Sequence, residues 1–110
     1  MARKKMVVVD PEKIEWEPVE QLKGAWAKVS SLDEETGAMA GLIKLDKSFH
    51  EPKHIHPSDY YAIVLEGKVV DEKENKIKRG MYIFIPAGVE HGVLDVPEGC
   101  VLSIQRNGPA

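Results

Sequence analysis

Residues 80–91 read GMYIFIPAGVEH, and this stretch gives the clearest indication of the fold. Gly80 precedes an apolar run rich in β-branched and aromatic residues, which is the pattern of a strand. The tripeptide Pro86-Ala87-Gly88 supplies residues that accept turn dihedrals, and His91 follows shortly after it. The stretch therefore predicts two strands joined by a tight turn, with a histidine at the start of the second strand.

The same alternation of short apolar segments and breakers extends over the rest of the chain. Turn-forming residues recur roughly every eight to twelve positions, which is typical of a β-sandwich or barrel. The predicted strands are residues 6–9, 25–30, 39–45, 53–56, 60–65, 68–71, 81–85, 89–96 and 101–105. The predicted turns are residues 33–37, 66–67, 71–75, 79–80, 86–88 and 97–99. The best helical candidate, residues 19–23, is only about one turn long.

We therefore expect an all-β fold in one domain that spans residues 1–110. The length of 110 residues is that of one domain with one core. Residues 1–15 are expected to form an N-terminal arm or an edge strand that pairs with a partner subunit, because a sheet edge needs covering.

Composition excludes several classes of function. The net charge is −3, and the only basic cluster is Arg3-Lys4-Lys5, so a nucleic-acid partner is disfavoured. Cys100 is the only cysteine, which rules out an intramolecular disulfide and a thiolate-rich zinc site. The apolar run at residues 6–9 is much shorter than a signal sequence or a membrane span. We expect a cytoplasmic protein with no membrane partner.

Two histidines lie close together in the string Pro52-Lys53-His54-Ile55-His56-Pro57. Successive side chains alternate faces on an extended strand, so His54 and His56 are expected to point the same way. Two imidazoles on one face can reach a common ion at about 2.0–2.1 Å each. An exposed pair on a surface strand has the same pattern, so the pair alone leaves both interpretations open.

Taken together, these segments resemble the two sequence motifs of the cupin superfamily. The second motif runs glycine, five residues, proline, one residue, glycine, two residues, histidine, and Gly80, Pro86, Gly88 and His91 match it. The first motif maps onto His54 and His56, with Gly67 as its final glycine. The resemblance implies a single cupin barrel, a double-stranded β-helix or jelly roll, with one divalent metal ion on His54, His56 and His91.

This chain departs from the cupin motifs at three positions. Ser48 stands where the first motif begins with glycine, Tyr60 where it has a glutamate, and Asp95 where the second motif ends in asparagine. Tyr60 shares the parity of the histidine pair and is expected to face the cavity. We favour a role for Tyr60 as a wall beside the ligands or a donor to a bound oxygen, rather than as a ligand, because a phenol has a pKa near 10.

Within the superfamily, residues 35–60 look like the branch related to the zinc-binding domain of ChrR anti-sigma factors and to acetylacetone-cleaving dioxygenases. That resemblance implies that three histidines form the whole protein ligand set, without a carboxylate. An ion held only by neutral imidazoles keeps its full positive charge. It is therefore a stronger Lewis acid than an ion that also has a carboxylate ligand.

Four other side chains could in principle bind a metal or take part in catalysis, but each is expected to have a structural or surface role. His50 is expected in an exposed loop, and Asp59 in a turn or salt bridge. Glu90 is expected to be a surface charge, and Cys100 a small core residue.

Three functions stay open at this point. The first is a metal-dependent enzyme, such as a dioxygenase, acting on a dicarbonyl or carboxylate-like small molecule in the barrel. The second is a non-catalytic metal or ligand sensor of the ChrR type, and the third is a barrel whose histidines bind nothing. The metal is not specified by the ligands, since imidazoles suit zinc, iron, nickel, manganese and copper. A homodimer is the expected assembly.

Overall fold

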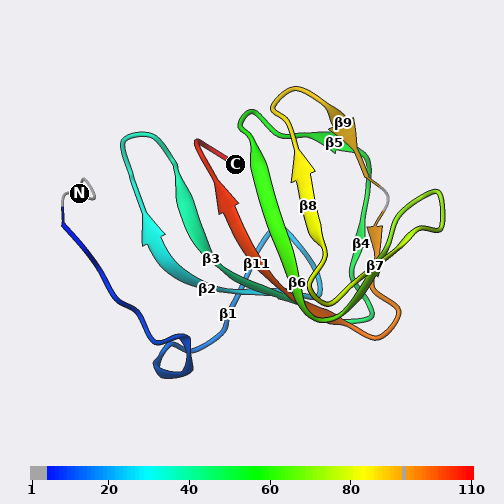
Figure 1. Ribbon diagram of the computed structural model, residues 1–110, viewed down its shortest axis with the longest axis horizontal. Coiled ribbons are helices and arrows are strands. Elements are labelled where there is room, and N and C mark those ends of the chain that lie inside the picture. The colour runs from blue at the N-terminus through cyan, green and yellow to red at the C-terminus, as the bar shows by residue number, and fades with distance from the viewer. Residues whose placement is uncertain (1–4, 93) are drawn as a thin grey trace.

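The computed structural model describes residues 5–92 and 94–110, and its regular secondary structure is almost entirely antiparallel strands (Figure 1). One turn of 3-10 helix, η1 (Pro11–Lys13), lies in the N-terminal segment. The strands are β1 (Glu17–Pro18), β2 (Ala25–Leu32), β3 (Met39–Leu45), β4 (His50–Glu51), β5 (His54–Ile55), β6 (Tyr60–Val70), β7 (Lys76–Lys78), β8 (Tyr82–Ile85), β9 (Glu90–His91), β10 (Leu94–Asp95) and β11 (Cys100–Arg106). The expected all-β class is confirmed.

The strands form one large sheet and one small one. The large sheet has the order β1-β2-β3-β11-β6-β10-β4, and β7 and β8 also pair with β6. The small sheet contains only β5 and β9. In Figure 1 strands β2, β3, β11, β6 and β8 form one curved wall, and β4, β5, β7 and β9 lie to its right. The long strand β6 takes part in both sides, because its start pairs with β8 and its end pairs with β7 and β10.

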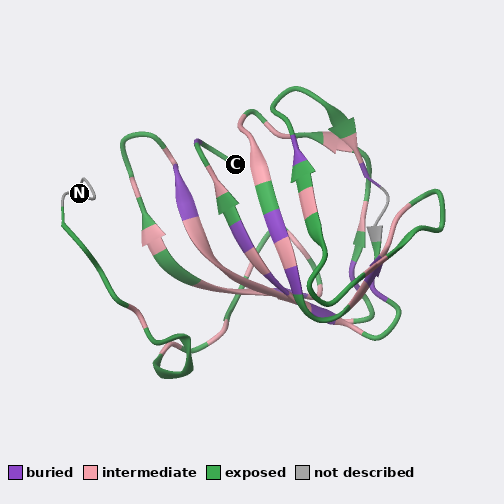
Figure 2. Ribbon diagram, viewed as in Figure 1, coloured by how far each residue is buried: buried purple, intermediate pink, exposed green. Residues whose placement is uncertain are grey.

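The core lies between these walls and follows the two-residue period of the strands. In β6, Ala62 and Val64 are buried, whereas Tyr61 is exposed on the other face. Burial therefore alternates along the strand, as Figure 2 shows for the curved wall. Val64, Val69 and Val96 are the largest fully buried side chains among the described residues.

The turn predicted at residues 66–67 is wrong, because β6 continues through it to Val70. Gly67 has a φ of +74°, and the register between β6 and β11 shifts two residues before it, where Leu65 is left out of the pairing. A glycine of this kind produces a bulge that bends a long strand, rather than a chain reversal. An alanine Cβ at Gly67 would lie 2.2 Å from the carbonyl oxygen of Gly99.

Five further segments differ from the sequence-based expectations. Residues 6–9 form no strand, and residues 19–23 form turns and no helix. The segment predicted as one strand at 89–96 is split into β9 and β10, with Gly92 between them at a φ of +148°. Strands β4 and β7 were not predicted, because two or three residues beside turn formers carry no readable alternation. Within the described ranges, no helix is long and apolar enough to cross a membrane.

We expect Gly67→Ala to lower the free energy of unfolding by about 3 kcal/mol, because the substitution combines a left-handed backbone with a steric clash. Gly80→Ala is the matched control: its φ is +86°, but a Cβ there meets nothing within 4 Å. The control should lower the free energy of unfolding by only about 1–2 kcal/mol, because it has the unfavourable backbone conformation without the clash. Urea denaturation of both variants measures the difference, and equal losses would contradict the role assigned to the contact with Gly99.

Candidate metal centre

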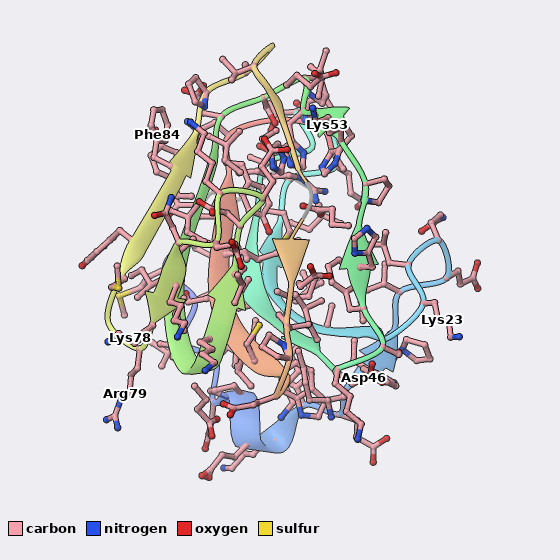
Figure 3. All side chains as sticks on the ribbon, turned by 90° about the vertical axis from the view of Figure 1, so that its right-hand side faces the viewer. Lys23, Asp46, Lys53, Lys78, Arg79 and Phe84 are labelled. Carbon is pink, nitrogen blue, oxygen red and sulfur yellow. The ribbon has the colours of Figure 1, made fainter. Side chains whose placement is uncertain are left out.

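The small sheet brings the three predicted histidines together. His54 and His91 are directly opposite in the antiparallel pairing of β5 and β9, and His56 follows two residues after His54. Residues opposite one another in such a pair have neighbouring side chains on one face of the sheet. Figure 3 looks onto this side of the molecule, where Lys53, the residue before β5, lies near the top.

The three imidazole rings converge. Ring centroids are 4.6 Å apart for His54 and His56, 4.3 Å for His54 and His91, and 4.9 Å for His56 and His91. One nitrogen from each ring lies within 4.8 Å of the others. The Nε2 atoms of His54 and His56 are 3.2 Å apart. Two ligands at right angles, each about 2.1 Å from an ion, are about 3 Å apart, so this pair has the spacing of adjacent ligands.

Hydrogen bonding selects which nitrogens are free. The carbonyl oxygen of Pro52 lies 2.9 Å from His54 Nδ1, so that nitrogen carries the proton and donates. His54 Nε2 is then left with its lone pair directed toward the cluster. A backbone acceptor on one ring nitrogen is the arrangement that orients metal-ligating histidines. His91 Nε2 is buried and has no hydrogen-bond partner in the described part of the chain.

The cluster favours neutral imidazoles. Burial, followed by the charges of His54 and His56, lowers the pKa of His91 to about 4. Burial, followed by the charge of His54, also lowers the pKa of His56. Neutral imidazole is the form that binds a metal, so these two histidines need lose no proton to bind one near neutral pH.

Tyr60 contacts the cluster through His56. The two rings stack with centroids 4.8 Å apart and an interplanar angle of 4°. Burial is the main cause that raises the pKa of Tyr60 above its ordinary value, and the charge of Glu51 adds to it. The phenol therefore stays protonated, which suits a wall or a hydrogen-bond donor better than a phenolate ligand.

Glu51, which was not predicted as a site residue, also reaches the cluster. Its Oε2 lies 3.7 Å from His54 Nε2 and its Oε1 lies 3.9 Å from His91 Nδ1, and the side chain is 17% exposed. Burial raises the pKa of Glu51, against an opposing effect of His54. The sequence gives only a weak indication of this role, namely that Glu51 lies three residues before His54 and is followed by Pro52.

The remaining candidate residues lie outside the cluster. The His50 side chain is 58% exposed, and its Nδ1 is 2.7 Å from Asp95 Oδ1. Asp59 accepts a hydrogen bond from the backbone N–H of Ala87 at 2.9 Å and so holds the turn before β9. Glu90 is exposed. Cys100 is buried in the core, where burial raises its pKa to about 11.

Comparisons with solved structures show the fold. An RmlC-like cupin from Shewanella frigidimarina NCIMB 400 is similar with a TM-score of 0.76 and 25% identity, over 96% of this chain and 93% of that one. An acetylacetone dioxygenase from Acinetobacter johnsonii is similar with a TM-score of 0.73 and 14% identity, over 96% and 75%. The Rhodobacter sphaeroides complex of SigE with the anti-sigma ChrR contains a chain with a TM-score of 0.68 and 20% identity, over 87% and 51%.

The sequence itself also identifies the family. No curated protein matches the chain. Residues 4–109, however, match the family described as the ChrR cupin-like domain. This match covers nearly the whole chain, and it agrees with the all-β structure and with the cupins among the similar folds. The chain therefore belongs to the family of ChrR cupin-like domains.

Proposed function

We propose that this cupin binds one divalent metal ion on His54, His56 and His91, and that the centre acts on an oxygen-bearing small molecule. The observation that carries the proposal is the convergence of three imidazoles of which one, His91, has a buried Nε2 without a partner. Burying a polar nitrogen without a partner is costly. A metal ion removes that cost and suits an all-nitrogen set of histidine ligands.

The residues around the cluster prepare it for a metal. Pro52 fixes the tautomer of His54, and burial keeps His56 and His91 neutral. Tyr60 is protonated and lies beside the ligands, stacked on His56. Bound there, a divalent ion supplies Lewis acidity toward oxygen ligands or, in the case of ferrous iron, oxidising chemistry with O₂.

The substrate class follows from the same chemistry. A cation on a small set of histidines attracts bidentate or anionic oxygen groups, so we propose a β-dicarbonyl or a carboxylate-like molecule. The similar fold of an acetylacetone dioxygenase supports this choice. The competing function is a metal or ligand sensor without catalysis, which the family match and the similarity to a chain of the SigE–ChrR complex support.

Protein purified without a histidine tag should contain about one divalent ion per chain, measured by elemental analysis. His54→Ala and His91→Ala should each reduce the content to less than about a tenth, because each removes one of three ligands. Glu90→Ala is the control, since Glu90 neighbours His91 in the chain but is exposed. A wild-type metal content near zero that neither ligand substitution changes would contradict the proposed site.

Loaded anaerobically with ferrous iron, the protein should consume O₂ when a β-dicarbonyl is added, and an oxygen electrode measures the rate. His91→Ala should reduce the rate at least about a hundredfold, because it removes a ligand. Tyr60→Phe should retain the ring stacked on His56 but lose the hydroxyl group, and a loss of about tenfold is expected. A fully metal-loaded protein that consumes no O₂ with any β-dicarbonyl would favour the sensor.

We also propose that the protein forms a homodimer through the outer face of the curved wall. A groove of about 560 Å³ lies on this face, and its lining includes Tyr61, Tyr82 and Phe84. These three side chains are 39%, 79% and 55% exposed. The N-terminal segment contributes Val9 to the groove and leaves Met6, Val7 and Val8 exposed next to it. Each chain thus exposes both the groove and the apolar N-terminal segment. In a dimer with a two-fold axis, these two surfaces of each chain would be covered by the other chain.

Sedimentation equilibrium should therefore give the mass of a dimer for the wild type and of a monomer for Phe84→Glu, since a buried charge at the interface is strongly unfavourable. Val89→Glu is the control, because Val89 is similarly exposed, at 46%, but lies in the turn beyond β8. A monomeric wild type, or dissociation caused equally by both substitutions, would contradict this interface.

A further inference from the structure

We propose that Glu51 is a fourth protein ligand of the metal centre and supplies, from strand β4, the carboxylate that the first cupin motif places at the position of Tyr60. The inference rests on the metal centre proposed above and extends it. Glu51 matches no fixed position of either motif, and it lies on strand β4, which precedes the histidine pair.

The pairing of β4 holds Glu51 facing inward. Strand β4 pairs with β10, with Glu51 opposite Leu94 and His50 opposite Asp95. The 2.7 Å contact between His50 Nδ1 and Asp95 Oδ1 fixes this short pairing at the surface. Because successive side chains alternate, the outward position of His50 at 58% exposure turns Glu51 inward, where it is 17% exposed.

The carboxylate of Glu51 ends near His54. Oε2 lies 3.7 Å from Nε2 of His54, and the other nitrogen of that ring is committed to the carbonyl of Pro52. The carboxylate is therefore on the ligating side of His54. Adjacent ligands are about 3 Å apart, and the broad terminal torsion of glutamate allows the remaining approach without moving the backbone.

The carboxylate of Glu51 lies near two histidines without a hydrogen bond to either. Its contacts with His54 and His91, at 3.7 and 3.9 Å, are too long to be hydrogen bonds. Among the residues described, the carboxylate thus faces two imidazoles to which it is not bonded. A mostly buried carboxylate requires a charged or hydrogen-bonding partner, and a divalent cation between it and the histidines is such a partner.

Cobalt(II) titration of the full chain tests the proposal, with the visible absorption spectrum and competition by a chelator as the two readouts. Glu51→Gln should bind cobalt at least about tenfold more weakly and should show a changed spectrum, because a ligand is lost. Glu90→Gln is the matched control: it removes an equal charge one residue from His91, but its side chain is exposed. The control should match the wild type in both readouts.

Glu51→Ala provides a second test that a merely structural role would not pass. The vacated position should accept external acetate, so millimolar acetate should return the cobalt spectrum toward that of the wild type. Affinity and spectrum unchanged in Glu51→Gln would overturn the proposal, as would weaker binding with an unchanged spectrum. If wild-type protein and Glu90→Gln both fail to bind cobalt, the three-histidine centre itself is wrong, an outcome distinct from the failure of Glu51 alone.

Discussion

The antiparallel pairing of β5 with β9 is the constraint on which the candidate site depends. It is a two-stranded sheet of two residues each, yet it places His54 directly opposite His91 and carries His56 on the continuing chain. So short a ladder is not stable alone, since isolated hairpins are marginal even when longer. The larger sheet and the turns around it must therefore hold these segments in place, and the convergence of the imidazoles is a property of the whole fold.

Three contacts show how the fold holds them. The N–H of Gly88 donates to the carbonyl of His56 at 2.9 Å, and Asp59 accepts from Ala87 in the same turn. After β9, Gly92 approaches the backbone of Lys53 so closely that a Cβ would lie 2.5 Å from its Cα. The two strands are thus clamped at both ends, which explains why the turn at residues 86–88 and the histidine after it belong to one structural unit.

The sequence predicted the parts of the structure that local rules govern. Alternation and breakers were enough for the all-β class, and the spacing of His54, His56 and His91 within the two motifs was enough for the cluster. The bend of β6 at Gly67 was predicted as a turn, because a glycine with positive φ serves bulges and reversals equally well. Glu51 was missed for a different reason: its position depends on the pairing of β4 with β10, a contact between segments over forty residues apart whose two-residue strands have no pattern of their own.

The charge of the centre connects the two proposals about the site. Three neutral imidazoles leave a divalent ion with its full charge, which favours strong binding of anionic oxygen groups. A carboxylate from Glu51 lowers the net charge by one and occupies a further coordination position, so fewer positions remain for small molecules. Tyr60 stands in the motif position where a glutamate would have supplied the same charge, and its ring instead stacks on His56. With Glu51 as a ligand, the carboxylate would come from β4, before the histidine pair, and not from the position of Tyr60 after it.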